Sequence, residues 1–579
     1  MDKAFDPISF PTLAPPEIPE HPSSVLLLPP PNVTGILHLG HALTGTIEDF
    51  LIRKKQLEGE TPLWIPGTDH AGIATQVVVE KKLERAGTTR TEIGREAFEA
   101  EVWKWKEEKG GTICSQLREL NLSLAWDKEY FTLDKKCSAA VQEAFVRLFE
   151  KGLIYRQFRL CSWSCALKSG ISDIEIDYTD IETPTKIEVP SPSGPYSLTV
   201  GYLTTFAYPL ENGGEIEVAT TRLETMLGDE AIAVSPEDTR FSSLVGQFAL
   251  HPFLLKRIPI IVDSMVDPAF GTGAVKITPG HDENDYACAL RYSLPLCTIF
   301  TEDGNMSEDC GEFAGMFRFQ VRKVLEKRLE EKGLFRGKVA HTMRIGCCSR
   351  TGDLIEPRLK EQWWLNCENM SKVALEAVET GELKLHPEIF SKTWANWLSN
   401  PRPWCLSRQL WWGHRIPAYK ILVNGKFVEW KVSRTLEEAF SYARQKYGNK
   451  FELLQDTDVL DTWFSSGLLP LSLANWPTVA DSPYFPSFIL ETGYDILFFW
   501  VARMVMLSLE LVEKLPFPEV YLHGLIRDAT GEKMSKGKGN AIDPRDFIFG
   551  AQVDVLLARV QESLLSKKDK VIACKNLRK

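Results

Sequence analysis

A short apolar run that stops at three prolines constrains this chain most. Val25–Leu28 is followed by Pro29–Pro31, a pattern that predicts a buried strand ending in a loop. The loop 32–35 leads into a polar-apolar pattern with helical spacing that continues to Lys55. A strand, a glycine-containing loop and a helix open a nucleotide-binding α/β unit. The sequence therefore predicts the α/β class, with a doubly wound, Rossmann-like parallel sheet.

Length and composition set the scale of the molecule. At about 100–200 residues per domain, 579 residues predict roughly three or four domains. A formal net charge of −11 argues against a general DNA-coating protein, so no DNA partner is predicted. The most apolar stretch, residues 496–512, contains Arg503 and Glu510, and we expect a buried helix there and no membrane partner.

The ends of the chain and its cysteines bear on location. The Pro-rich leader 1–22 has neither an apolar core nor an arginine-rich pattern, so no signal or transit peptide is predicted. Twelve scattered cysteines suit reduced thiols, and together these features predict a cytoplasmic location. Paired Cys-x-x-Cys spacing is absent around Cys161, Cys165 and residues 347–348, so no protein-held metal is predicted.

The texture of the chain changes twice. From about Lys186 to Lys338 the residues follow the alternating pattern that is typical of β-strands. Turn-forming residues, including Asn212–Gly214, interrupt this pattern. This stretch predicts an inserted β-rich domain, 186–338, between the two halves, 23–185 and 339–546, of an α/β domain. The remaining segment, 547–579, holds one amphipathic helical pattern and a basic tail.

Two histidines stand at the start of the first predicted helix. His38 and His41 are three residues apart and share one helical face, and Gly40 between them permits close approach to the backbone. Imidazole donors at a helix N-terminus can follow charge as it develops on a phosphate. The alternative is a pair of ordinary histidines near a glycine.

A lysine-rich, glycine-bounded segment, Gly531–Asn540, follows the strand pattern of residues 520–526. It carries Lys533, Lys536 and Lys538, and its ammonium groups could neutralise a triphosphate in the transition state. The alternative is a solvated basic loop.

In these two motifs the chain resembles the class I aminoacyl-tRNA synthetases, with their His-x-Gly-His and Lys-Met-Ser-Lys-Ser signatures. The stretches 29–35 (PPPNVTG), 66–76 (PGTDHAGIATQ), 404–417, 459–466 and 491–495 (ETGYD) resemble the valyl members of the class in particular. The resemblance extends from about residue 23 to about residue 546. It implies that 23–185 and 339–546 form the catalytic domain.

The resemblance implies formation of valyl-adenylate from valine and ATP, then transfer of valine to tRNA-Val. Catalytic roles are implied for His38, His41, Lys533 and Lys536, with Mg²⁺ bound together with ATP. The ATP-binding residues implied are Gly40, His523, Gly524 and Lys536.

The valine site implied by the resemblance has a charged part and an apolar part. Asp69 would bind the ammonium group, and its alternative is an exposed turn residue. The isopropyl group needs a short apolar pocket, for which ordinary core packing is the alternative. The remaining candidates are Pro29, Asn32, Trp463 and Ile496.

A pocket sized for valine cannot strongly reject threonine, its near isostere, so a second, hydrolytic site is expected. The inserted region resembles the editing domain of the class in residues 220–225, together with Gly228–Asp229, and in residues 275–285. A set of helix caps and turns is the alternative. The implied editing residues are Thr220, Thr221, Arg222, Thr225, Lys276, Asp282 and Asp285.

Two departures from the family pattern qualify the expected activity. Gly537 and Lys538 replace a serine and a hydrophobic residue in the lysine segment, and no anticodon-binding domain is recognised in 547–579. We therefore expect a C-terminally truncated enzyme with weak tRNA charging. The alternatives are isoleucine or leucine specificity, a non-catalytic paralogue or isoform that binds tRNA or a protein, and an editing-only hydrolase.

Overall fold

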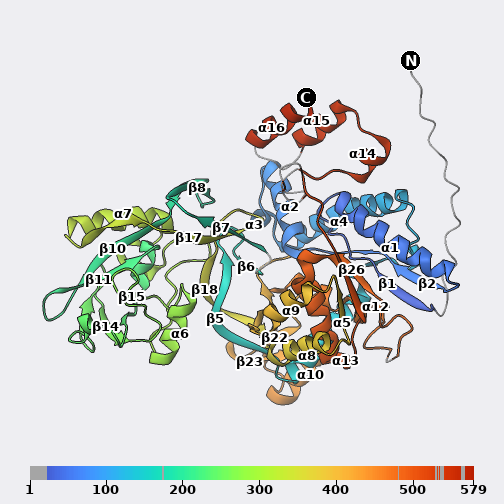
Figure 1. Cartoon of the computed structure of the whole chain (residues 1–579). Helices are drawn as coiled ribbons and strands as arrows, with labels where there is room; N and C mark the ends of the chain where they lie inside the picture. The colour runs from blue at the N-terminus through green and yellow to red at the C-terminus, as the bar shows by residue number, and fades with distance from the viewer. Residues whose placement is uncertain are drawn as a thin grey trace. The chain divides into compact units, whose positions relative to one another are not determined.

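The computed structural model describes residues 22–172, 175–479, 481–528, 531, 534, 540–562 and 567–578. The chain forms two compact units (Figure 1). Unit 1 comprises Met1–Tyr155, Leu365–Leu406 and Leu410–Lys579, and unit 2 comprises Arg156–Trp364 and Ser407–Gln409. The predicted insertion 186–338 lies within the sequence of unit 2, which also includes residues on either side of it.

Parallel strands joined by helices organise unit 1. Strand β1 (Ser24–Leu27) pairs in parallel with β2 (Pro62–Ile65), and helix α1 (Leu39–Leu57) connects them. In the second half of the unit, β26 (Leu490–Gly493) and β27 (Glu519–His523) are parallel and are connected through α13 (Arg503–Val512). The prediction of a Rossmann-like α/β fold is confirmed, because these are β-α-β crossovers.

Segments far apart in sequence meet in this unit. The Phe488 N–H donates to the Val25 carbonyl at 3.0 Å, and α1 packs against both β2 and β26. The core around β1 includes Leu26, Trp64 and Phe98, all at most 1% exposed. The other helices and strands of the unit that concern the site are β3 (Gly67–Thr68), α2 (Gly72–Arg85), α4 (Arg95–Glu119), β4 (Tyr130–Phe131), α5 (Lys135–Glu150), β19 (Lys384–His386), α11 (Thr462–Gly467) and α15 (Val553–Glu562).

The apolar stretch predicted as one buried helix is more varied than expected. It begins with a 3₁₀ turn, Tyr494–Ile496, continues as a π-helical turn, Leu497–Ala502, and becomes α-helical only in α13. The π-helical turn contains Trp500, whose Nε1 donates to the Ser466 carbonyl at 2.9 Å. Short π segments are frequent at functional sites. Among the described residues, no helix combines the length and apolar character that crossing a membrane requires.

Unit 2 is mainly antiparallel and contains the green strands of Figure 1. Strands β10 (Tyr202–Pro209) and β11 (Glu215–Thr220) form the hairpin predicted from the Asn212–Gly214 turn, closed by a hydrogen bond from the Leu210 N–H to the Gly214 carbonyl. The site segments are carried by further elements: the 3₁₀ turn η3 (Leu223–Gly228), β12 (Ala231–Val234), β14 (Arg257–Val262), β15 (Ala274–Ile277), α6 (Glu283–Tyr292), α7 (Arg318–Glu331), β16 (Phe335–Ala340) and β18 (Glu356–Leu365).

Candidate functional site

The two histidines of the first motif cap helix α1. His38 is the N-cap, and its Nδ1 accepts from the Gly40 N–H at 3.1 Å, while His41 Nδ1 accepts from the His38 N–H at 3.1 Å. Because each Nδ1 accepts a hydrogen bond, the proton of each neutral ring sits on Nε2. Both imidazoles therefore have a defined tautomer at the positive end of a helix, a location that favours phosphate.

Gly40 meets a steric requirement of this cap. A Cβ atom at residue 40 would lie 2.8 Å from Cε1 and 2.9 Å from Nδ1 of His38. The structure therefore requires glycine for packing of the His38 ring, in addition to the close ligand approach expected from the sequence.

Asp69 is a buried carboxylate, 3% exposed, and not an exposed turn residue. Its Oδ1 accepts from the Ala71 N–H at 2.6 Å and its Oδ2 from Ser466 Oγ at 2.7 Å. Burial raises the pKa of Asp69 to about 6, against the opposing effect of these two hydrogen bonds. A buried carboxylate with few donors around it suits a cationic ligand.

The other valine-site candidates are connected to Asp69 to different extents. Asn32, which is exposed, forms a parallel β-bridge with Asp69, and the loop around it follows the half-buried Pro29. Trp463 is half-buried and lies on α11, the helix that also carries Ser466. Ile496 is half-buried and directly precedes the π turn whose Trp500 contacts Ser466.

Ser466 was not predicted, although it links three parts of this site. Its hydroxyl donates to Asp69, its carbonyl accepts from Trp500, and it lies on the same helix as Trp463. It belongs to the 459–466 stretch, whose chain order gives no sign that its last hydroxyl reaches a residue 397 positions away.

The predicted adenosine residues lie at the end of β27. His523 Nε2 is 3.5 Å from Thr44 Oγ1 on α1, and its Nδ1 contacts Glu491 Oε1 at 2.5 Å. Glu491 begins the 491–495 stretch, but no role was predicted for its buried carboxylate. Burial raises the pKa of Glu491 despite the contact with His523. Gly524 follows His523 directly and has open space where a Cβ would be.

The lysine-rich segment was predicted to supply two catalytic residues. Lys533 and Lys536, like Gly537 and Lys538, lie outside the described residues.

In unit 2, Lys276 is the centre of the predicted editing residues. Its Nζ donates to Thr225 Oγ1 at 2.8 Å, to Asp229 Oδ1 at 2.9 Å and to Thr278 Oγ1 at 2.5 Å. No role was predicted for Asp229 or Thr278. Asp229 also accepts from Thr278 Oγ1 at 2.6 Å and from the Tyr208 hydroxyl at 2.7 Å. The result is a buried polar cluster in which the three N–H donors of Lys276 and the hydroxyl protons of Thr225 and Thr278 all have acceptors within the protein, so a ligand would meet mainly acceptor oxygens.

The two aspartates of this segment have different surroundings. Asp282 is the N-cap of α6 and accepts from the Asn284 and Asp285 N–H groups at 2.8 and 3.1 Å, which fits the cap alternative. Asp285 is buried, and its Oδ2 accepts from the Thr278 N–H at 2.8 Å. Burial, with the nearby Asp282 charge, raises the pKa of Asp285.

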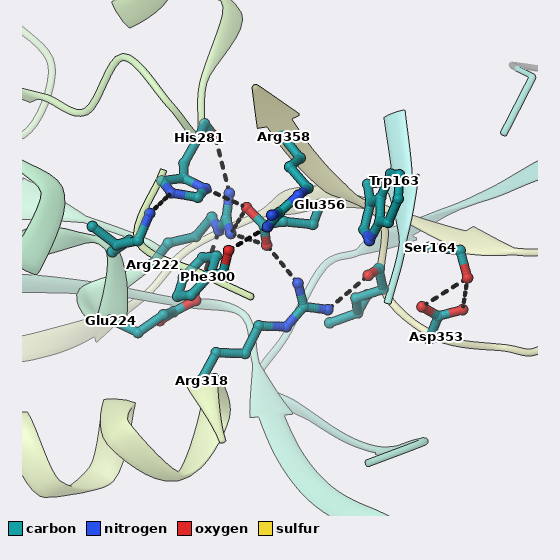
Figure 2. A network of polar contacts seen from close by, with 12 residues as sticks. Trp163, Ser164, Arg222, Glu224, His281, Phe300, Arg318, Asp353, Glu356 and Arg358 are labelled. Atoms are coloured by element: carbon teal, nitrogen blue, oxygen red, sulfur yellow. Dashed lines mark hydrogen bonds and ion pairs between the residues drawn. The ribbon is translucent and has the colours of Figure 1, made fainter. Parts of the chain in front are cut away.

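The threonine-rich segment ends in an ion pair. Thr220 Oγ1 accepts from the Arg222 N–H at 3.0 Å, and Thr221 is half-buried. The Arg222 guanidinium donates to Glu356 and to the carbonyl of His281 (Figure 2).

Metal ligation has no support in the described part of the chain. There, no group of three or more His, Cys, Asp or Glu side chains is arranged to bind a metal, and all twelve cysteines are free thiols.

The chain is similar in sequence to known proteins that are named valine–tRNA ligases. A valine–tRNA ligase of Arabidopsis thaliana, named mitochondrial 1, is 52% identical over 95% of this chain and 51% of its own length. The valine–tRNA ligases of Homo sapiens and Caenorhabditis elegans are 50% and 49% identical over 94% and 95% of this chain, and over 44% and 54% of their own lengths. The chain thus spans about half the length of these relatives.

The family described as tRNA synthetases class I (I, L, M and V) matches residues 17–570, nearly the whole sequence. Together with the β-α-β crossovers of unit 1 and the capped histidine motif, this match shows that the chain belongs to the class I tRNA synthetases.

Proposed function

We propose that this chain activates valine as a valine–tRNA ligase does, by forming valyl-adenylate and pyrophosphate from valine and ATP. The observation that carries the proposal is Asp69, a buried carboxylate held by Ser466 and the Ala71 N–H. It would bind the valine ammonium group and so orient the substrate carboxylate toward the α-phosphorus. The oxygen–phosphorus bond formed replaces the bond to pyrophosphate, and no protein nucleophile is needed.

The remaining roles follow from the same proposal. The Nε2–H groups of His38 and His41 would donate to ATP phosphates at the N-terminus of α1. His523 and Gly524 would contact adenosine, while Pro29, Trp463 and Ile496 would limit the side-chain pocket to the size of valine. Lys533 and Lys536 would stabilise the departing pyrophosphate, with Mg²⁺ supplying further charge neutralisation when bound with ATP.

We also propose that unit 2 hydrolyses threonine from mischarged tRNA-Val. The supporting observation is the buried cluster of Lys276, Thr225, Asp229 and Thr278, which lies beside Asp285. Its threonine and aspartate oxygens would accept a hydrogen bond from the threonine hydroxyl, which valine lacks, and Asp285 would bind the substrate ammonium group. Discrimination by such hydrogen bonds exceeds that of an apolar pocket alone.

Valine-dependent exchange of labelled pyrophosphate into ATP tests the first proposal without tRNA. Valine should support exchange, threonine less and isoleucine very little, and Asp69→Asn should abolish the valine signal. Exchange with isoleucine or leucine instead would establish the rival specificity. No exchange with any amino acid would favour a non-catalytic or editing-only chain.

Charging of tRNA-Val and the location in the cell are separate proposals. Charging is expected to be weak, and aminoacylation of tRNA-Val beside a longer relative measures it. For location the proposal is the cytoplasm, and cell fractionation distinguishes it from the mitochondrion named for the Arabidopsis relative.

A further inference from the structure

The buried Glu356 carboxylate is in contact with three side chains of unit 2, of which His281 and Arg318 are buried and Arg222 is half-buried (Figure 2). Glu356 is the first residue of β18, and its exposed fraction is 1%. Oε1 accepts from Arg222 Nη2 at 2.7 Å and contacts His281 Nδ1 at 3.0 Å. Oε2 accepts from Arg222 Nη2 at 2.5 Å and from Arg318 Nη1 at 2.6 Å.

These contacts connect the two segments of the candidate editing site. Arg222 belongs to residues 220–225, and His281 belongs to residues 275–285. A further bond, from Arg222 Nη1 to the His281 carbonyl at 3.0 Å, joins the segments directly. Glu356 lies in neither segment and follows the predicted insertion in sequence, so motif analysis gave no reason to select it.

The His281 ring has one orientation and one tautomer in this arrangement. Its Nε2 accepts from the Ile299 N–H at 3.0 Å, so Nδ1 carries the proton and donates to Glu356. Burial lowers the pKa of His281, although Glu356 opposes this, and the ring is therefore neutral at pH 7. The next residue, Asp282, caps the helix that carries Asp285.

Arg222 transmits its position to the polar cluster. Its carbonyl accepts from the Thr225 hydroxyl at 2.8 Å, and Thr225 Oγ1 in turn accepts from Lys276 Nζ. Glu356 is thus connected with Lys276 by three successive contacts, through Arg222 and Thr225. Through His281 and Asp282 it is also connected with Asp285.

We propose that Glu356 is a positioning residue of the editing site, which holds Arg222 and His281 so that the Lys276 cluster and Asp285 act on one substrate. The proposal rests on the proposed editing function. Arg318, 2% exposed and also bound to the Leu354 carbonyl, anchors the carboxylate from α7.

The test is Glu356→Gln in the full chain, assayed by single-turnover hydrolysis of threonyl-tRNA-Val. Glutamine keeps the size but presents an amide donor to groups that are donors themselves, so Arg222 or His281 loses its acceptor. We expect the hydrolysis rate constant at saturating enzyme to fall at least about 30-fold, because small displacements in a site cost this much. The enzyme concentration that gives half the maximal rate should change much less.

Asp353→Asn is the matched control. Asp353 is another buried carboxylate of unit 2 and accepts from Ser164 Oγ at 2.9 Å and from the Ala166 N–H at 3.1 Å. It should leave hydrolysis close to that of the unmodified chain. If both variants lose activity equally, a general loss of packing explains the result and the positioning role is overturned.

A double-variant comparison separates positioning from stability. If Glu356 acts through Arg222, the double variant Glu356→Gln/Arg222→Lys should show a smaller fold-decrease in the hydrolysis rate constant than the product of the fold-decreases of the two single variants. Independent losses that multiply would overturn the proposal. An unmodified chain that cannot hydrolyse threonyl-tRNA-Val would overturn the editing function itself, whereas an active chain with an equally active Glu356→Gln variant would overturn only the role of Glu356.

Discussion

At the scale of single residues, the hydroxyl of Ser466 illustrates how the candidate valine site is held. It donates to Asp69 Oδ2 at 2.7 Å, although the Thr462 carbonyl, at 2.9 Å, is also within its reach. A hydrogen bond to a buried charged group contributes more than one between neutral groups. Loss of this hydroxyl should therefore act on ligand binding through the Asp69 carboxylate.

We expect Ser466→Ala to raise the KM for valine in pyrophosphate exchange by roughly 10- to 100-fold, because a bond to a charged group contributes about 1.5–3 kcal/mol. Ser465→Ala is the matched control, since Ser465 Oγ also donates to the Thr462 carbonyl at 2.9 Å and lies on the same helix. Equal KM values for the two variants would contradict the role given to Ser466.

The raised pKa of Asp69 predicts a pH dependence. Above about pH 6 the carboxylate is charged and can pair with the valine ammonium group, and below that pH it takes up a proton and loses this interaction. The kcat/KM for valine should therefore fall about tenfold per pH unit below the pKa. The Ser466 hydrogen bond lowers the pKa of Asp69, so Ser466→Ala should move the inflection of this profile to higher pH. An inflection that does not move would show that the profile does not report the titration of Asp69.

At the scale of elements, the start of α1 was well predicted, and the reason is local. A strand, a loop and a capped helix depend on neighbours in sequence, and β1 and α1 begin within a few residues of the expected positions. Asp229, Thr278 and Ser466 lie in stretches that carried the resemblance, but none was assigned a role, because their roles come from tertiary contacts. The π turn 497–502 was missed for a similar reason, since apolar periodicity does not distinguish a π turn from an α-helical one.

The packing of Gly40 against His38 gives a prediction about α1. Gly40→Ala should lower the pyrophosphate-exchange rate at least about tenfold, because a Cβ there would displace the His38 ring. Thermal stability should not fall by much, because alanine is about 1 kcal/mol better than glycine within a helix.

Gly111→Ala provides the comparison for this variant. Gly111 lies in α4, is exposed and has nothing within 4 Å of an added Cβ. It should gain a similar stability and leave exchange unchanged. A Gly40→Ala enzyme as active as Gly111→Ala would refute the steric account.

At the scale of the whole molecule, two candidate sites lie in two compact units. Asp69 and His38 belong to unit 1, while Asp285 and Lys276 belong to unit 2. Each site is built from contacts inside its own unit. The division predicts that chemistry in one unit can be removed without loss of the other.

Asp285→Asn tests this separation. Hydrolysis of threonyl-tRNA-Val should fall at least about 30-fold, because loss of one member of a buried charge pair costs 2 kcal/mol or more. Valine-dependent exchange should be unchanged. Asp69→Asn should give the reverse pattern, and parallel losses in both assays for either variant would show that the units do not act separately.

The order in which the chain is made bears on its folding. Unit 2 is nearly one continuous stretch, whereas the Val25 carbonyl of unit 1 is bonded to Phe488. At a synthesis rate of 5–20 residues per second, Phe488 is added roughly 20 to 90 s after Val25, and the hydrogen bond between them cannot form earlier. During this interval the apolar strand β1 lacks part of its final surroundings, while unit 2 can already collapse. The speed of the ribosome and the supply of chaperones should therefore decide how much of unit 1 reaches its native state.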